Sequence, residues 1–148
     1  MISPSEELLE QKQQYKLSKQ IGYLLRLASQ RHAVIFQKNI SEDLTPTQFT
    51  TLIRVFETGR VSQNHLGRLA AMDVATVKGV VDRLKAKGLV ISSANPTDKR
   101  RSDISLTPKG QSTVQTLMDD GLRISEETLK PLTQAEKKTL MRLLEKIT

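Results

Sequence analysis

The chain has 148 residues and a net charge of +7, with 37% hydrophobic and 26% charged residues. This length suits one domain with a single core, and the composition is that of a globular protein rather than a disordered one. The absence of cysteine excludes disulfides, thiolate catalysis and cysteine-ligated metals. No apolar run approaches the roughly 20 residues of a membrane span, and the first residues lack the pattern of a secretory leader, so we expect a cytoplasmic protein without membrane contact.

The positive charge is concentrated in the middle of the chain. Residues 61–110 hold 9 Lys or Arg against 4 Asp or Glu, whereas residues 1–60 hold 8 against 6 and residues 111–148 hold 6 against 6. A basic segment of this kind is the electrostatic footprint of a protein that binds a polyanion, most often nucleic acid. The alternative is a solvated basic face with no such partner.

Helical periodicity dominates the first part of the chain. Apolar residues three and four apart predict a first helix over about residues 15–39, with residues 5–14 either extending it or forming a separate turn. In the segment LTPTQF, Thr45 is placed to cap a second helix and Gln48 to complete a capping box, with proline at the first helical position. This second helix is expected to end at Gly59.

Two short helices follow and predict a helix-turn-helix. The first starts at Ser62, and the second starts at Asp73 and is closed by Gly88. In the second helix we expect four apolar side chains to pack inward: Val74, Val77, Val81 and Leu84. The opposite face carries Ala75, Thr76, Lys78, Gly79, Asp82 and Arg83.

A β-hairpin, or wing, is predicted after the helix-turn-helix. Residues 89–92 and 104–106 read as its strands and residues 95–98 as turn chemistry, with a basic tip behind the turn. Residues 107–129 and 133–148 then read as two further helices, the second of which opens with a capping box of Thr133 and Glu136. The predicted fold class is mainly α with a small β-hairpin wing, in three parts: helical flanks at 1–43 and 111–148, and a winged helix-turn-helix at 44–110.

This arrangement has the chemistry of DNA reading. Residues near the start of a recognition helix reach base edges in the major groove, whereas the polar start of the preceding helix suits phosphate contact. Arginine on a hairpin can enter a narrow minor groove. The candidate DNA-binding residues are Ser62, Gln63, Asn64, Ala75, Thr76, Lys78, Gly79, Arg83, Lys99, Arg100 and Arg101. Taken singly, each basic residue among them is more often a solvated surface charge, so the prediction rests on their conjunction.

Three blocks of the sequence resemble the MarR family of winged helix-turn-helix transcription regulators. Residues 98–110 match the pattern D-x-R-x5-L-T-x-x-G, and the segments 44–49 and 81–90 are also similar to that family. The resemblance covers residues 20–148. It implies a triangular homodimer in which the helical flanks interlock and two winged lobes bind a pseudo-palindromic operator in double-stranded DNA. It also implies that Asp98 pairs with Arg100 to shape the wing.

The residues themselves also favour a dimer. The flanking helices carry apolar stripes with no obvious partner within the chain, as a symmetric interface requires. Two-fold symmetry predicts half-sites about one helical turn, roughly 10 bp, apart.

Aromatic residues gather at the start of the chain: Tyr15, Tyr23, Phe36, Phe49 and Phe56. They either line an apolar pocket or form ordinary core. Gly22 and Arg26 are four residues apart and share a helix face, where glycine permits close approach and arginine can hold a carboxylate bidentately. An ion pair at the rim of a dimer interface explains Arg26 equally well. His32 lies about 240° around the helix from Arg26, so both face one pocket only if the partner chain supplies one of them.

The segment Gly22–Arg26 together with His32 resembles the branch of the MarR family that responds to small aromatic acids. The resemblance implies that Arg26 holds the carboxylate of a ligand such as a hydroxybenzoate or a hydroxynicotinate and that His32 lines the site. The candidate ligand-binding residues are Gly22, Tyr23, Arg26, His32 and Phe49. No cluster of His, Asp and Glu has the spacing of a metal site, so we expect no metal and no cofactor.

Four functions were compared on these grounds. A ligand-responsive regulator, most simply a repressor, accounts for both the basic wing and the arginine on the first helix. A ligand-independent DNA-binding regulator or architectural protein needs only the wing. A winged-helix module for protein interaction leaves the basic segment unexplained. An enzyme is not expected, because no phosphate loop, nucleophile motif or paired carboxylates occur.

Overall fold

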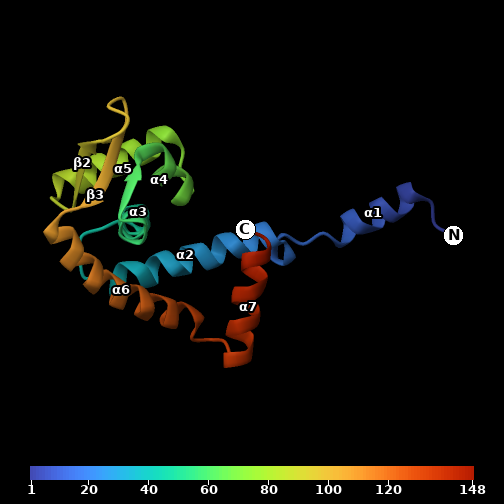
Figure 1. Cartoon of the computed structure of the whole chain (residues 1–148). Helices are drawn as coiled ribbons and strands as arrows, with labels where there is room; N and C mark the ends of the chain where they lie inside the picture. The colour runs from blue at the N-terminus through green and yellow to red at the C-terminus, as the bar shows by residue number, and fades with distance from the viewer.

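The computed structural model describes all 148 residues and confirms a mainly helical fold with a small antiparallel sheet (Figure 1). The elements are α1 (Pro4–Gln14), the 3-10 turn η1 (Leu17–Lys19), α2 (Ile21–Asn39), α3 (Pro46–Thr58), β1 (Arg60–Ser62), α4 (Gln63–Leu69), α5 (Val74–Ala86), β2 (Val90–Ala94), β3 (Ser102–Leu106), α6 (Pro108–Leu129) and α7 (Gln134–Lys146). None of these helices combines the length and the apolar character needed to cross a bilayer.

We call residues 44–110 the central lobe and residues 1–43 and 111–148 the flanks. In Figure 1 the lobe lies at one end, with α2 and α6 beneath it, α7 turned across the end of α6, and α1 standing away from the rest. Helices α2 and α6 pack against each other. Helices α1 and α7 contain no buried residue.

The helix starts follow the predicted caps. Thr45 accepts a hydrogen bond from the Gln48 backbone N–H, and the Gln48 side chain accepts one from the Thr45 N–H. Thr133 and Glu136 form the same reciprocal pair at the start of α7. At the end of α3, Gly59 has φ +81°, a left-handed conformation that side chains disfavour. Local sequence therefore sets these boundaries.

The first helix begins later than predicted. Lys16 and Gln20 both adopt extended backbone angles, which separate α1, η1 and α2, so α2 starts at Ile21 rather than near residue 15. The periodicity of residues 15–20 rests on the single apolar side chain of Leu17, which remains exposed. Without a surface to pack against, this segment gains little from continuing the helix.

The sheet has three strands in the order β1-β3-β2, all antiparallel. Strand β1 was not predicted, because three residues are too few for an alternating pattern, and it exists through its pairing with β3, where Val61 lies opposite Ile104. The hairpin strands β2 and β3 are longer than predicted. β3 is thereby the central strand and fixes the wing to the lobe.

A cluster of fourteen buried apolar residues forms the core, and twelve of them lie in the central lobe. The prediction that Val74 packs inward is wrong, since it is 68% exposed, and Val80 is buried instead. Val74 is the first residue of α5, ahead of the turn that reaches the core. The core also includes Val114 and Leu117 of α6, so it continues past residue 110.

The start of α6 is held against the end of α5 and the start of the wing by hydrogen bonds and close packing. Thr107 Oγ1 donates to the Gly88 carbonyl at 2.6 Å and accepts from the Gly110 N–H at 3.0 Å. A Cβ on Gly110 would fall on the Leu89 carbonyl, far inside van der Waals contact. The L-T-x-x-G part of the sequence pattern is thus explained by a cap and by a close approach that only glycine permits.

Candidate nucleic-acid interface and ligand site

Helix α5 presents its polar face to solvent. Val77, Val81 and Leu84 are fully buried beneath it, whereas Ala75, Thr76, Lys78, Asp82 and Arg83 are exposed and Gly79 is partly buried. Because three turns of α5 are anchored in the core, the exposed face is held in a fixed orientation. A rigid helix with small and hydrogen-bonding residues at its start fits the requirements of a major-groove reader.

Two carboxylates shape this helix. Asp73 caps it by accepting the Thr76 N–H at 2.7 Å, and this hydrogen bond lowers the pKa of Asp73. Lys78 Nζ pairs with Asp82 one turn later at 3.0 Å, with both side chains largely exposed. The charge available to DNA from Lys78 is therefore partly neutralised until a phosphate or base competes with Asp82.

The start of α4 and the wing enclose a polar hollow of about 610 Å³. Its lining contains no hydrophobic residue and consists of Ser62, Gln63, Asn64, His65, Arg68, Asp98, Arg100, Arg101 and Ser102. Ser62 is buried, and its hydroxyl oxygen accepts the His65 N–H, so only its proton is free for a phosphate. The sequence analysis did not include His65 and Arg68 among the DNA-binding candidates. Their position on the short helix that precedes the predicted recognition helix could have indicated them.

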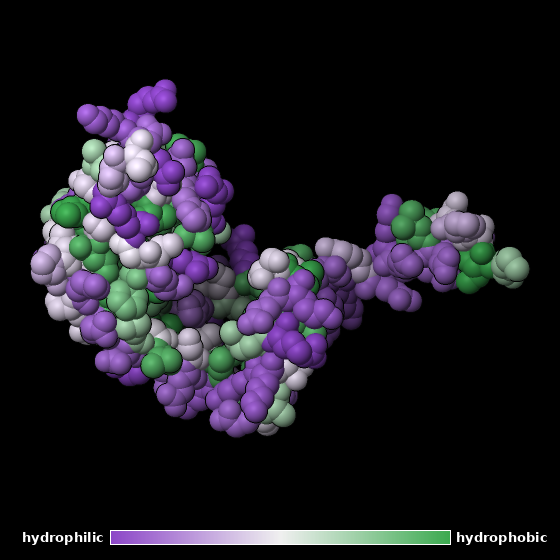
Figure 2. Space-filling view, viewed as in Figure 1, coloured by the Kyte–Doolittle hydropathy of each residue, from purple (hydrophilic) through white to green (hydrophobic).

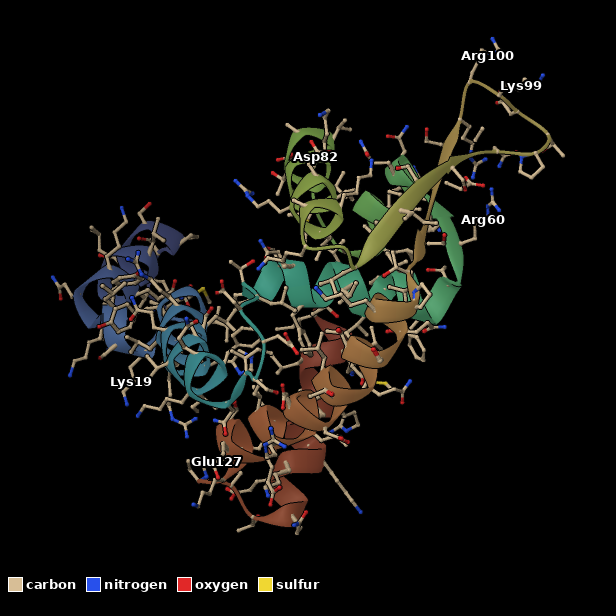
Figure 3. All side chains as sticks on the ribbon, turned by 90° about the vertical axis from the view of Figure 1, so that its left-hand side faces the viewer. Lys19, Arg60, Asp82, Lys99, Arg100 and Glu127 are labelled. Carbon is tan, nitrogen blue, oxygen red and sulfur yellow. The ribbon has the colours of Figure 1, made fainter.

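The wing tip is an exposed cationic turn. Asn95 Oδ1 accepts the backbone N–H groups of Thr97 and Asp98, which closes the turn. Asp98 Oδ1 accepts the Arg100 N–H at 3.1 Å and lies 3.7 Å from the Arg100 Nε. Lys99 and Arg100 project from the tip (Figure 3), and the Arg100 side chain is 96% exposed. Behind the tip, Arg101 Nε lies 3.8 Å from Asp103. The turn is thus ordered by Asn95 and Asp98, while Lys99 and Arg100 remain exposed to a polyanion.

A buried carboxylate ties the wing to β1. Asp103 accepts hydrogen bonds from Arg60 Nε at 3.0 Å and from Asn95 Nδ2 at 2.9 Å. The same guanidinium donates to the Ser93 hydroxyl and the Ala94 carbonyl on β2. Arg60 of β1 therefore connects all three strands at the end of the hairpin next to its turn. Sequence reasoning missed this clamp, because its partners are up to 43 residues apart.

The ligand candidates on α2 do not share one face. Gly22 is exposed with open space where a Cβ would be, and Tyr23 is partly buried. Arg26 is exposed and takes part in none of the ion pairs of the protomer. His32 instead faces α6, where its Nδ1 lies 2.8 Å from the Thr128 hydroxyl. Within one protomer the five candidates are therefore not brought together.

The end of α6 is joined to α2 by two adjacent side chains. Arg31 donates to the Thr128 carbonyl at 2.7 Å and to the Glu127 carbonyl at 3.2 Å. These carbonyls belong to the last turn of α6, where the regular helical donors run out, and the Glu127 carbonyl also accepts the Lys130 N–H at 3.4 Å. His32 contacts the Thr128 side chain. Neither Arg31 nor Thr128 was singled out from sequence, because nothing local marks a contact across 97 residues.

Phe49 lies where α2, α3 and α6 meet. Its ring contacts Phe36 edge-to-face, with the centroids 5.6 Å apart, and a Cβ on Gly121 would come within 3.1 Å of it. Phe36 is buried and Phe49 partly buried. Phe49 thus packs as core at the junction of lobe and flanks and reaches the surface only with part of its ring.

A second buried carboxylate holds the same junction. Asp120 of α6 accepts the backbone N–H of Ser41 at 2.9 Å and also accepts from the Ser41 hydroxyl and from Arg123. Burial opposes ionisation of Asp120, but the Ser41 hydrogen bonds and the Arg123 charge outweigh it and lower the pKa of this carboxyl. Ser41 lies between α2 and α3, so this contact joins α6 to the segment that leads from α2 into the lobe.

Several known proteins are similar to this chain in sequence and in structure. A sequence profile of the MarR family matches residues 44–102. The transcriptional repressor NicR of Pseudomonas putida is 37% identical over 134 residues, which are 90% of this chain and 85% of NicR. A probable transcriptional regulator from Pseudomonas aeruginosa, known from its crystal structure, is 45% identical with a TM-score of 0.88, over 90% of this chain and all of the other. BpsR of Bordetella bronchiseptica, whose DNA binding is regulated by 6-hydroxynicotinic acid, is 38% identical with a TM-score of 0.85, over 90% of this chain and 96% of BpsR.

Proposed function

The chain belongs to the MarR family of DNA-binding transcriptional regulators, and we propose that it is a homodimeric repressor that a small aromatic carboxylic acid releases from its operator. Membership makes it a transcription regulator and not an enzyme. What the proposal adds is the repressor role, the dimer, the palindromic site and the ligand class. Acting on chromosomal DNA, it would work in the cytoplasm.

The likeness to BpsR carries the ligand class. BpsR shares 38% of its residues over nearly its whole length, and its DNA binding is regulated by 6-hydroxynicotinic acid. The similarity to NicR, a repressor, supports the direction of regulation. We therefore propose a hydroxylated aromatic acid, a hydroxynicotinate before a hydroxybenzoate, as the ligand.

The lobe supports the DNA half of the proposal. The exposed start of α5 would enter the major groove, and the wing tip with Arg100 would enter the adjacent minor groove. The polar hollow between α4 and the wing has the cations and free N–H groups that a phosphate needs. A two-fold dimer would place two such lobes on half-sites roughly 10 bp apart.

The flanks support the dimer and the ligand site. Exposed apolar side chains along α2 and α7, among them Leu24, Leu25, Leu140 and Leu143, need a cover that one protomer does not provide. Figure 2 shows apolar surface on the helices below the lobe, in contrast to the hydrophilic wing tip. In the dimer, Arg26 of one chain and His32 of the other would face one pocket, with the guanidinium holding the carboxylate.

The test is fluorescence anisotropy of the full chain on the DNA upstream of its own gene. It is run in moderate salt with 6-hydroxynicotinate, nicotinate, 4-hydroxybenzoate or no acid. Tight, sequence-dependent binding that one acid releases supports the proposal. Tight binding that no acid releases indicates a ligand-independent regulator or architectural protein. Binding no better than to random DNA indicates an interaction module.

Two substitutions separate the roles of wing and ligand site. Arg100→Ala is expected to weaken operator binding strongly in a dimer that remains folded, whereas Lys12→Ala, which removes a charge on the distant α1, leaves it unchanged. Arg26→Ala is expected to keep operator binding and lose the response to acid, and Arg26→Lys to recover it only in part. Loss of dimerisation in Arg26→Ala would instead assign this residue to the interface.

A further inference from the structure

The contact between His32 and α6 is one link in a chain of two hydrogen bonds. Thr128 Oγ1 lies 2.7 Å from the Ile124 carbonyl oxygen one turn earlier in α6. His32 Nδ1 lies 2.8 Å from the same Oγ1. Ile124 is buried and Thr128 partly buried, whereas His32 is exposed. The chain thus runs from the interior of α6 to an imidazole at the surface.

The proton positions along this chain follow from valence. A carbonyl oxygen has no hydrogen, so at 2.7 Å the hydroxyl proton of Thr128 must lie between Oγ1 and the Ile124 oxygen. A hydroxyl has only one proton to donate, so Oγ1 can only accept from His32. Nδ1 of His32 therefore carries a proton, and in the neutral imidazole Nε2 bears the lone pair.

We propose that Thr128 is a positioning residue, which fixes His32 in the tautomer whose Nε2 accepts a hydrogen bond and thereby selects aromatic acids that carry a hydrogen-bond donor. The ligand half of this inference rests on the proposed function. The tautomer half does not, since it concerns the protein alone.

The surroundings hold the pair in place. Arg31, next to His32 on α2, donates to the carbonyls of Glu127 and Thr128, so the last turn of α6 is fixed to α2 on both sides of the Thr128 side chain. To turn Nε2 of a neutral imidazole into a donor, His32 would have to give up the Nδ1 proton and set two lone pairs against each other at 2.8 Å. Alternatively, Thr128 would have to give up its hydrogen bond to the Ile124 carbonyl and donate to His32 instead.

The fixed tautomer would favour ligands that donate a hydrogen bond to Nε2 over ligands that can only accept one. A ring hydroxyl or a ring N–H can donate to Nε2 while the carboxylate is held by Arg26. A methoxy group, which is larger than a hydroxyl by one methyl group, offers only lone pairs and meets the lone pair of Nε2. Because an unmade buried hydrogen bond is costly, we expect donors to be preferred by about tenfold or more.

The tautomer can be observed directly, because the chain has only two histidines, His32 and His65. We would record long-range ¹H–¹⁵N correlation spectra of the imidazole nitrogens on the full-length protein, at about pH 8.5, where an ordinary imidazole is neutral. His65→Gln assigns the signals. The expected result is a protonated Nδ1 and an unprotonated Nε2 for His32. A protonated Nε2 in the wild type would overturn the proposal.

Three variants show whether Thr128 is responsible. Thr128→Val keeps the shape and removes the hydroxyl, so His32 should move toward the Nε2-protonated tautomer that free imidazole side chains favour. Thr128→Ser should retain the wild-type pattern. Thr116→Val makes the same change at an exposed site on α6 and should alter nothing. An unchanged tautomer in Thr128→Val, in a protein that melts like the wild type, contradicts the assignment.

Operator release tests the ligand half with 4-hydroxybenzoate and 4-aminobenzoate as donors and 4-methoxybenzoate as the acceptor-only probe. The donors should act at concentrations at least about tenfold lower in the wild type and in Thr128→Ser, and the gap should fall below about threefold in Thr128→Val. An equal response to all three acids overturns the selectivity. If no acid releases the operator, the proposed function and the ligand half both fail, whereas the imidazole spectra still decide the tautomer.

Discussion

The central lobe buries most of its apolar side chains, whereas the flanks leave many of theirs exposed. Twelve of the fourteen core residues lie in the lobe, whereas sixteen of the eighteen large apolar side chains that remain exposed lie in the flanks. The lobe has three helices folded over a small sheet, while α1 and α7 bury nothing. The lobe therefore buries its own apolar side chains, whereas the flanks leave theirs uncovered within one protomer, as the proposed dimer requires.

This contrast fits the proposed function, which requires both a rigid DNA reader and a frame that responds to a ligand. Deforming a close-packed core costs free energy, so we expect the lobe to move as a rigid body. An interface made between chains can change its geometry by sliding or rotation. A ligand bound in the flanks can therefore alter the spacing of two lobes without altering either lobe, provided that it binds the two arrangements with different affinity.

The largest effect is expected in the core of the lobe. Leu52 is fully buried, and Leu52→Ala should lower the free energy of unfolding by about 2–5 kcal/mol through lost burial and a cavity. Urea unfolding followed by circular dichroism measures it. Val74→Ala, in the same lobe at a 68% exposed site, should change stability by less than about 0.5 kcal/mol. Equal losses would mean that the lobe does not depend on its core.

A charge on the apolar side of α7 should separate the chains and spare the lobe. Leu143 and Leu140 line an apolar hollow of about 380 Å³. Leu143→Glu should weaken dimerisation by about a hundredfold, about 2.7 kcal/mol, because an unpaired charge would be buried in the interface. Sedimentation equilibrium measures it. Lys138→Glu, about 140° around the same helix, is the control. A dimer that survives Leu143→Glu places the interface elsewhere.

Removal of the strand clamp should affect the wing more than the core. In Arg60→Ala, the buried Asp103 keeps only Asn95 as a hydrogen-bond donor, and β2 loses two hydrogen bonds. Because the guanidinium is half exposed, we expect a loss of about 1–2 kcal/mol of stability. Operator affinity, measured by anisotropy, should also fall. Arg100→Ala is the comparison, since it should lower affinity with no loss of stability.

The last effect concerns the contact between α6 and the segment that leads into the lobe, and it fades in acid. The pKa of Asp120 is lowered from its ordinary value of 3.8 in the folded chain, so its contribution is complete above that value and is lost as the pH falls below it. At neutral pH, Asp120→Asn should cost about 1–2 kcal/mol.

Melting curves recorded from pH 7 downward test the direction of this pH dependence. The gap between the wild type and Asp120→Asn should narrow as the pH drops through 3.8. Asp119→Asn, at the exposed neighbouring site, should show no such gap. A gap that widens in acid would contradict the assigned direction of the pKa.

Sequence patterns predicted those features that are encoded locally. The capping boxes at Thr45 and Thr133 and the turn at Asn95 need only neighbouring residues, and each occurs as expected. The break between η1 and α2 was missed because periodicity describes which face is apolar, not whether anything covers it. Strand β1 was missed because its partner lies more than 40 residues away.

The site shows the same division between local and distant information. The exposed face of α5 and the cationic wing tip are visible in the sequence, since both are runs of neighbouring residues. The partners that hold them are not. Asp103 reads as one more polar residue of a strand until Arg60 is placed beside it, and Thr128 reads as a surface threonine until α2 crosses it.

The order of elements along the chain has a consequence for shortened chains. The last residue of the core cluster, Leu117, is followed by 31 residues that contribute nothing to that cluster. Because domains fold as units, we expect a chain that ends after α6 to form the central lobe. Under the proposed function, such a chain would read one half-site but would lack α7 for pairing with a second copy.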